Sequence, residues 1–596
     1  MTVLAAPKLA TDAVPIVFMA AGAWCFGWFH PARLPARKVG VVLCSPIGYE
    51  AICAHQTYTQ LAEALAEAGF AVVRFDYHGT GDSAGGDADP DRVRAWMDSI
   101  TSAINELKRL GDVLHVAFFG VRLGATLAAH TASQLGGIES LVMWAPCITG
   151  RSFARELRAA SGNRPKSVRP VALGDIEALG YLYTAQTLQD LQALDCQCLD
   201  RPLARRVLIL GRDDMPDEGP LPSRFRDIGM DTSYAVMHGY SGMMTEPHEA
   251  VSAPATLNLI TDWLSAAHPL PDTLQELTST AAPGPIDYVV DGIREIPQLF
   301  GPGLSLFGIL SESAELKSSD GRLETAILML NVGSNYHIGP NRMYVKTARS
   351  LAASGYRTFR FDLAGIGDSR PQPGLSIGGI YSKDSIASVQ AAIDSLVAQG
   401  CKKFYLMGIC SGSYVAFQTA LVDPRVTGQI LMNSRLLEWH DGNEGCTWQS
   451  SMQMYYNSSD FYRRALLRPE LYRRLLRGEV DVNGIARRLR TVFKAQLVRA
   501  FNRFIDRAPA EEGVLDKVKN LSARGTDTVL IMSSDDDGRD YVEFQFGRLG
   551  SRMQGNPNFR MVLVEESDHT FSDSESQRFV IHTVQEHLKK RISKMG

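Results

Sequence analysis

The chain has 596 residues, too many for a single hydrophobic core, so at least two domains are expected. Its 61 Lys and Arg against 65 Asp and Glu give a net charge of -4, which excludes a general attraction to nucleic acid or to an anionic membrane. The nine cysteines are scattered and odd in number, so they form no disulfide framework and no metal-ligand doublets. We therefore expect a cytoplasmic protein with no metal, no organic cofactor and no nucleic-acid partner.

The first feature along the chain is an apolar segment, residues 13–25. Lys8 before it is offset by Asp12, and the segment runs directly into strand-like residues 26–31. This pattern favours a first β-strand over an export signal. No run of 18 apolar residues occurs anywhere, so we predict no transmembrane segment.

The main organisational feature is an internal repeat. Residues 68–83, AGFAVVRFDYHGTGDS, return as residues 354–369, SGYRTFRFDLAGIGDS. An apolar strand and an amphipathic helix precede each copy, and a helix and a strand that ends in a glycine-rich turn follow it. Strands that alternate with helices in this way predict an α/β fold, with a mostly parallel sheet covered by helices on both faces.

The repeat predicts a tandem of two α/β domains. Residues 268–287 are rich in Pro, Thr and small residues and have no sustained apolar period, so we interpret them as the linker. The expected domains are therefore residues 1–267 and 288–596.

The second half carries a G-x-C-x-G motif at residues 408–412, between an apolar strand and an apolar helix. It is a variant of the G-x-S-x-G elbow of the α/β-hydrolase fold, which predicts Cys410 as the nucleophile. The helix N-terminus there favours the thiolate. Ser411 is the rival nucleophile, but with Ser411 as the central residue the motif loses both of its glycines. The N–H of Ser411 is therefore better assigned to an oxyanion hole. Gly333 or Ser334 is expected to supply the second N–H donor.

A general base and an acid are expected after the nucleophile in chain order. His569 directly follows an apolar strand, so we predict it as the base. Three consecutive residues, Asp535, Asp536 and Asp537, follow an earlier strand. Alignment with the first half sets Asp536 against Asp214 and favours Asp536 as the acid.

The first half has arginine at the same elbow, since residues 120–124 read Gly-Val-Arg-Leu-Gly. Arg122 is not a nucleophile, and we expect this half to be silent for acyl-enzyme chemistry, with a docking, scaffold or regulatory role. Asp214 and His248, or His238, stand where an acid and a base would lie. Arg122 forms either a structural salt bridge with Asp214 or a clamp for a carboxylate or phosphate.

Several segments of the second half resemble those of exosortase-A-system-associated hydrolases: RFDLAGIGDS, GICSGS, DPRVTGQILMNSRL and DHTFS. The likeness runs from about residue 300 to the end and implies an α/β-hydrolase fold with cysteine in the elbow. The first half, through GWFHP, GYEAICAH, FDYHGTGDSAG and GVRLGATLA, is similar to related hydrolases with arginine there. Cysteine elbows also occur in proteins similar to dienelactone hydrolase and polyhydroxyalkanoate synthase, so the reaction stays open.

A long insertion at about residues 436–520 lies where this fold carries its cap. Its centre, residues 461–507, holds thirteen Arg or Lys and four acidic residues, with leucine and aromatic residues at helical spacing. We expect a helical basic cap. Its charge is either a solvated face or a surface for a polyanionic carrier, such as an acidic acyl carrier protein or coenzyme A.

These features predict an enzyme that forms an acyl-Cys410 intermediate from an acyl thioester and passes the acyl group to an alcohol or amine. Thiolate attack on a thioester is nearly balanced in energy, which suits a transferase. Thioesterase or esterase activity through the same intermediate is the alternative. A non-catalytic docking or scaffold protein with two hydrolase folds is the rival from another class.

Overall fold

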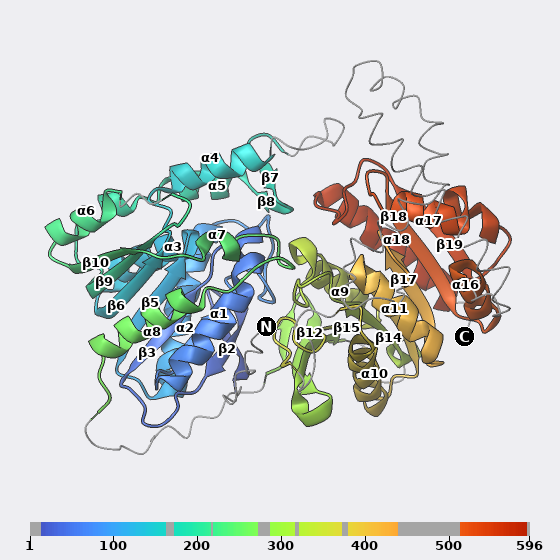
Figure 1. Ribbon diagram of the computed structural model, residues 1–596, viewed down its shortest axis with the longest axis horizontal. Helices are drawn as coiled ribbons and strands as arrows, with labels where there is room; N and C mark the ends of the chain where they lie inside the picture. The colour runs from blue at the N-terminus through green and yellow to red at the C-terminus, as the bar shows by residue number, and fades with distance from the viewer. Residues whose placement is uncertain are drawn as a thin grey trace, which may run out of the picture.

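A computed structural model describes residues 13–161, 172–215, 219–271, 286–315, 321–371, 380–438 and 513–592. The chain forms two α/β units that lie side by side, the first in blue to green and the second in yellow-green to red (Figure 1). The predicted linker lies largely outside the described residues, as do residues 439–512 of the predicted basic cap. No described helix is long and apolar enough to cross a membrane.

The first half is built on an eight-stranded sheet of order β1-β2-β4-β3-β5-β6-β9-β10. Strands β1 and β2 are antiparallel to their neighbours, and the pairs from β4 to β10 are parallel. The apolar segment of residues 13–25 forms strand β1 and the start of β2, as predicted. The strands are β1 (Val14–Ala20), β2 (Ala23–His30), β3 (Val39–Cys44), β4 (Val72–Phe75), β5 (His115–Val121), β6 (Ile138–Trp144), β9 (Ala204–Gly211) and β10 (Asp231–Val236).

The second half repeats this order in β12-β13-β15-β14-β16-β17-β18-β19, with one extra strand, β11, at the edge. The directions of the strands repeat as well, so the internal repeat of the sequence is a repeat of topology. The strands are β11 (Tyr288–Val290), β12 (Ile293–Phe300), β13 (Leu306–Ser313), β14 (Thr325–Leu330), β15 (Arg357–Phe361), β16 (Lys403–Ile409), β17 (Val426–Met432), β18 (Asp527–Ser533) and β19 (Phe559–Val564).

Helices cover both faces of each sheet, as predicted. In the first half α1 (Tyr49–Glu67) and α8 (Pro254–Ala267) share one buried cluster, and α2 (Arg92–Gly111) and α3 (Leu123–Leu135) share another on the opposite face. The second half divides in the same way. There α9 (Met343–Ala353) and α18 (Ser574–Ile592) cover one face, and the other is covered by α10 (Lys383–Ala398), α11 (Ser411–Val422), α16 (Val514–Ala523) and α17 (Arg539–Phe546).

Between β6 and β9 the first half carries its own insertion. It contains α4 (Gly150–Ser161), a hairpin of β7 (Ile176–Ala178) and β8 (Tyr181–Tyr183), and α5 (Ala185–Gln192). Two short helices, α6 (Leu221–Asp227) and α7 (Tyr240–Met243), flank β10. The corresponding insertion of the second half follows β17, which is where the cap was predicted.

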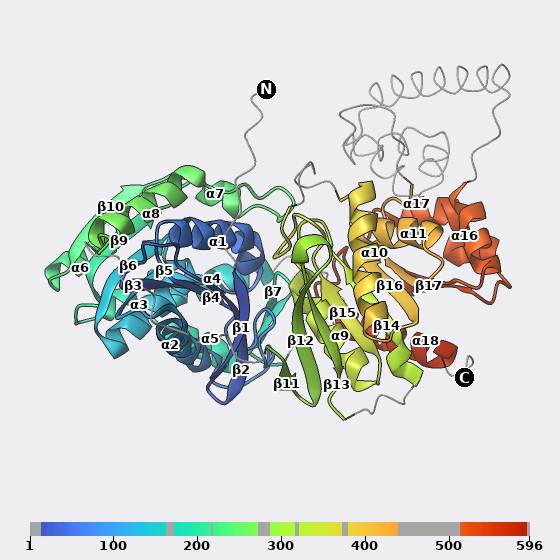
Figure 2. The ribbon, with the colours of Figure 1, turned by 90° about the horizontal axis from the view of Figure 1, so that it is seen from below.

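The two copies of the repeated motif meet at the contact between the halves, near β2 and β11–β13 at the centre of Figure 2. The N–H of Phe26 donates to Ser83 Oγ at 2.9 Å, and the N–H of Phe307 donates to Ser369 Oγ at 2.9 Å. The rings of Phe26 and Phe307 stack across the contact with centroids 6.0 Å apart. Equivalent residues therefore face each other, as in a two-fold dimer of identical subunits.

Buried arginines of the second half hold the glycine turn of the first half. Arg342 is 2% exposed and donates to the carbonyl oxygens of Gly79, Gly81, Ser83 and Gly85. Arg360 is fully buried and forms ion pairs with Asp82 of the first half and Glu295 of its own half. Because buried charges need partners, this contact fixes the halves as one unit.

Candidate active site

Cys410 lies at the turn between β16 and α11, and its backbone has φ 54° and ψ -113°. This left-handed geometry is costly for a residue with a side chain, and it projects the half-buried thiol from the strand end. Arg122 has φ 54° and ψ -125° at the corresponding turn of the first half. Both halves therefore contain the predicted elbow.

The glycines of the second elbow allow close packing of the turn. A Cβ on Gly408 would lie 2.2 Å from the carbonyl carbon of Gly412, and one on Gly412 would lie 2.9 Å from the oxygens of Leu330 and Asn331. No side chain fits at either position. The G-x-C-x-G spacing thus follows from the contact of α11 with β16 and with the end of β14.

His569 and Asp536 are brought together at the carboxyl ends of β19 and β18. His569 Nδ1 is hydrogen-bonded to Asp536 Oδ2, and Asp536 Oδ1 accepts from the N–H of Gly538 at 2.7 Å. Burial lowers the pKa of His569, but hydrogen bonds to Asp536 and to the Cys410 thiol raise it more, to about 9. The imidazole of His569 is therefore hydrogen-bonded to the predicted acid, and it also interacts with the thiol of the predicted nucleophile.

The neighbours of Asp536 have other partners. Asp536 is buried, whereas Asp535 and Asp537 are exposed. Asp535 accepts a hydrogen bond from Ser534 Oγ at 3.0 Å, and Asp537 accepts from Arg435 Nε at 2.7 Å. Among the described hydrogen bonds, Asp536 is therefore the one of the three aspartates that is bonded to His569.

The expected oxyanion donors surround the elbow, but one of them is engaged. The N–H of Gly333 donates to Ser411 Oγ at 2.8 Å. Ser411 is 3% exposed, and its own N–H lies at the first turn of α11, where helix N–H groups have no intrahelical partner. A carbonyl oxygen bound here would replace the Ser411 hydroxyl on Gly333, or use the amide of Ser334.

Asn433 supports the site, and sequence reasoning did not identify it. Its side chain donates to His569 O at 2.7 Å and to Ser533 Oγ at 2.9 Å, and it accepts from the N–H of Ser533 at 2.7 Å. It thereby joins the ends of β17 and β18 to the histidine loop. Asn433 has a φ of 43°, a conformation that Asn tolerates better than most residues. Nothing in the sequence around it predicted this conformation.

Arg435 is a second residue that the sequence did not single out. Burial lowers its pKa, but the charges of Cys410, Asp537 and Asp536 raise it overall. Cys410 is thus among the groups that act electrostatically on the Arg435 guanidinium. Arg435 lies shortly after the end of β17, within the segment DPRVTGQILMNSRL. No motif or periodicity in the sequence marked it as a site residue.

The predicted salt bridge between Arg122 and Asp214 is wrong. Arg122 Nε donates to Glu50 Oε1 at 3.0 Å, and a second guanidinium nitrogen pairs with Glu156. Asp214 is instead exposed and paired with Arg212. Since Arg122 is 5% exposed and holds two carboxylates, it has no free face for the anion clamp considered above.

The structure does not assemble a second site from Arg122, Asp214 and His248. His248 is exposed, and its nearest acids are Glu246 and Glu249. A Cβ on Gly333 would lie 3.7 Å from the Cβ of His248, which places this histidine beside the Gly333 loop of the second half. For His238 the described contact is a backbone one, from Thr256 Oγ1.

Within the described parts of the chain, two groups of side chains have the spacing of metal ligands. The first, Asp536, Asp537 and His569, is the site just described. The second is His337, Asp362 and Asp368. Burial would lower the pKa of His337, but Asp82 and Asp362 raise it well above its usual value, so its nitrogens act as donors and suit a metal poorly.

Family comparisons agree with this geometry. Residues 52–192 match the family described as "Serine aminopeptidase, S33", and residues 330–581 match the "Alpha/beta hydrolase family". Both halves are α/β-hydrolase folds. The matches support hydrolase activity in a general sense and leave the nucleophile and the acceptor undecided. No curated protein matches the chain.

Several solved structures are similar to less than half of this chain. Est1E from Butyrivibrio proteoclasticus is 14% identical, with a TM-score of 0.32, and covers 43% of this chain and 99% of its own. An alpha-beta serine hydrolase homologue from Coxiella burnetii is 15% identical, with a TM-score of 0.30, and covers 43% and 99%. XC6422 from Xanthomonas campestris is 15% identical, with a TM-score of 0.27, and covers 44% and 96%. Similarity at this level bears on neither substrate nor mechanism.

Proposed function

We propose that the second half is a cysteine-dependent acyl-transfer enzyme that takes an acyl group from a thioester. The observation that carries the proposal is the alignment of Cys410, His569 and Asp536 at the elbow. A thiol at a strained strand-to-helix turn, an imidazole in contact with it and a buried carboxylate behind the imidazole are the parts that acyl-enzyme chemistry requires.

In the first step the Cys410 thiolate adds to the thioester carbonyl, and the new oxyanion is bound by the N–H of Ser411 and by the Gly333 or Ser334 amide. The C–S bond to the donor breaks, and the departing thiol takes its proton from protonated His569. In the second step His569 removes a proton from the acceptor, which attacks acyl-Cys410 and releases the thiolate. Asp536 holds the imidazole in one tautomer through both steps, and Arg435 stabilises the thiolate.

The acceptor is an alcohol or amine in the principal proposal and water in the second. Transfer is favoured because a thioester intermediate preserves the activation of the acyl group. Hydrolysis is favoured by the two family matches, which are both to hydrolase families. The donor is proposed to be an acyl group on coenzyme A or an acidic carrier protein, because of the positive charge of residues 461–507.

We further propose that the first half is a non-catalytic domain that holds the histidine loop of the second. Lys346 Nζ bridges Asp87 of the first half at 3.0 Å and Gln577 Oε1 of α18 at 3.3 Å. Gln577 Nε2 in turn donates to Phe571 O at 3.0 Å, two residues beyond His569. These contacts link the first half to the position of the base.

A second contact acts on the same loop. Ser574 at the start of α18 is hydrogen-bonded to Glu177 in the β7–β8 hairpin of the first half. Deletion of residues 1–267 should therefore yield a second half that is insoluble or poorly active. A soluble and fully active second half would refute this role.

Intact-protein mass spectrometry after incubation with acyl-CoA or acyl-carrier donors tests the enzyme proposal. We expect an adduct of one acyl group that is lost in Cys410→Ala and kept in Ser411→Ala. Cys198→Ala is the matched control, because Cys198 is the exposed cysteine among the described residues and would capture acyl groups non-specifically. An adduct that survives when Cys410→Ala and Cys198→Ala are combined would refute the assignment.

Product analysis then separates the acceptors. An alcohol or amine that becomes acylated at the expense of free acid indicates a transferase, and free acid alone indicates a thioesterase. The absence of any adduct or turnover with every donor would favour the third possibility, a docking or scaffold protein with two hydrolase folds.

A further inference from the structure

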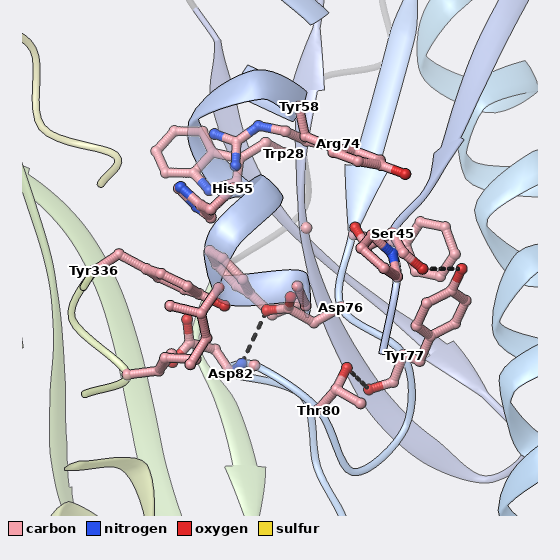
Figure 3. A pocket seen from close by; sticks show the side chains of 18 of the residues that line it. Trp28, Ser45, His55, Tyr58, Arg74, Asp76, Tyr77, Thr80, Asp82 and Tyr336 are labelled. Carbon is pink, nitrogen blue, oxygen red and sulfur yellow. Dashed lines mark hydrogen bonds between the residues drawn. The ribbon is translucent and has the colours of Figure 1, made fainter. Parts of the chain in front are cut away.

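A cavity of about 60 Å³ lies between the halves. Most of its lining residues belong to the first half, and neither Cys410, His569 nor Asp536 is among them. Figure 3 shows Asp76 in the middle of its side chains, with Tyr336 of the second half on one side and Ser45 and Tyr77 on the other. The volume suits a few non-hydrogen atoms, so it would take a small ligand or the head group of a larger one.

Asp76 differs from the other carboxylates around the cavity, because they have cationic partners. Asp82 pairs with Arg360 and His337, and Asp368 pairs with Arg74. Asp76 Oδ2 accepts from the N–H of Asp82 at 2.9 Å, but among the described residues no side chain donates to Asp76 and none forms an ion pair with it. Burial and then the Asp82 carboxylate raise the pKa of Asp76 to about 6, although the N–H of Asp82 and the charge of His55 lower it.

The repeat shows what this carboxylate lacks. Asp362 occupies the same motif position in the second half, and it also accepts a backbone N–H, from Asp368 at 3.0 Å. In addition, Asn331 Nδ2 donates to Asp362 Oδ1 at 2.8 Å and His337 Nδ1 binds Asp362 Oδ2 at 2.7 Å. Two side-chain nitrogen donors, one of them cationic, therefore satisfy the oxygens of the Asp362 carboxylate.

The first half omits both donors. Ser45 at the end of β3 corresponds to Asn331 at the end of β14, and its shorter side chain does not bond to Asp76. Where the second half has the loop that carries His337, the first half has already begun α1, which presents Ala51, Ile52 and His55 to the cavity. In the first half the cavity therefore occupies the position that the Asn331 and His337 side chains take beside Asp362 in the second half.

The remaining walls suit an organic cation. The aromatic residues that line the cavity are Phe26, Trp28, Tyr58, Phe75, Tyr77, Tyr181 and Tyr336. Aromatic rings attract cations, as Arg74 over the Trp28 ring at 5.1 Å already shows in this lining, and a carboxylate in the same cavity supplies the counter-charge for an ammonium group. The two basic residues of the lining, Arg74 and His55, both lie against Asp368, Arg74 at 2.6 Å and His55 at 3.6 Å.

We propose that this cavity binds a small organic ammonium group, whose N–H donors take the place on Asp76 that Asn331 and His337 take on Asp362. The proposal concerns the first half and does not depend on the acyl-transfer chemistry of Cys410. It gives the half without a nucleophile a ligand-binding role at the contact with the catalytic half.

Thermal unfolding of the full chain with methylammonium chloride tests the site. We expect a saturable increase in melting temperature that equal concentrations of sodium chloride or tetramethylammonium chloride do not produce, since neither cation has an N–H donor. The increase should be lost in Asp76→Asn, which removes the charge, and kept in Asp200→Asn, an acid whose side chain is 83% exposed.

Ser45→Asn is the second variant, because Asp76→Asn also alters the turn and could fail to fold. It supplies the amide that Asn331 provides in the second half, so it should abolish the methylammonium effect in a folded protein. An equal effect of tetramethylammonium, no effect of methylammonium on the unaltered chain, or a full effect in Ser45→Asn would each overturn the proposal.

Discussion

Arg74 of the first half donates a hydrogen bond to Asp368 of the second at 2.6 Å, and both side chains are largely buried. The pair mirrors the one between Arg360 and Asp82, because Arg74 and Arg360 occupy the same position in the two copies of the repeated motif, and Asp82 and Asp368 occupy another. Each copy thus pairs with the other, which explains why these residues are identical in a chain whose two elbows differ.

The first prediction concerns this pair. Arg74→Ala and Asp368→Ala should each destabilise the chain by about 3–5 kcal/mol, because each leaves a buried charge without its partner. The double variant should lose less than the sum of the two. Urea unfolding followed by fluorescence measures the coupling in a double-mutant cycle.

The control for this cycle is the exposed pair of Arg294 and Asp287, with N–O distances of 2.8–2.9 Å. Its side chains are 47% and 36% exposed, so its loss should cost less than about 1 kcal/mol. Equal costs for the two pairs would contradict the view that burial makes the contact between the halves strong.

A second prediction distinguishes the three aspartates after β18. Asp536→Asn should lower the rate of acyl transfer by roughly a hundred-fold to ten-thousand-fold, because the amide no longer stabilises the imidazolium or fixes its tautomer. Asp535→Asn and Asp537→Asn, whose carboxylates bond to Ser534 and Arg435, should change it only a few-fold. Steady-state kinetics decides, and a loss centred on Asp535 or Asp537 would contradict the assignment.

The third prediction is for Asn433. Asn433→Ala removes the donor to His569 O and should lower kcat roughly ten-fold to a hundred-fold through misplacement of the imidazole, with KM little changed. The single-turnover rate of Cys410 acylation measures the effect. A variant that is less stable but acylates at the normal rate would show that Asn433 supports only the fold.

Stability should depend on pH through His569. Its pKa of about 9 in the folded chain lies above the ordinary value of 6.5, so folding favours the protonated form. The stabilisation is complete below about pH 6.5 and is lost as pH rises through about 9. The difference in free energy of unfolding between the natural chain and His569→Gln should shrink by on the order of 2 kcal/mol from pH 6 to pH 10. A difference that is constant over this range would contradict the interaction of His569 with Asp536 and Cys410.

The fifth prediction is for the silent elbow. Arg122→Cys should restore the G-x-C-x-G pattern without creating an acyl-enzyme, because Asp214 pairs with Arg212 and His248 lies away beside Gly333. Mass spectrometry of Arg122→Cys combined with Cys410→Ala should show no adduct. The variant should also be less stable, since Glu50 loses its buried partner. Acylation in this background would show that a base and an acid are present after all.

Local patterns were sufficient for the fold and for the elbow residue. The order of strands and helices follows from apolar periodicity, and the glycines around Cys410 and Arg122 are required by close backbone contacts within one turn. Such features depend on residues near each other in the chain. The sequence therefore determined two α/β folds and the one half with a candidate nucleophile.

The tertiary structure decided which distant charges meet. The sequence alignment matched Asp214 with Asp536, yet one carboxylate is exposed on Arg212 and the other is buried against His569. Arg122 pairs with Glu50 and Glu156 instead, and among the described residues Asp76 has no ion-pair partner, whereas Asp362 pairs with His337. Ion pairs depend on the final separation and burial of side chains, which periodicity does not encode, so only the folded chain could show them.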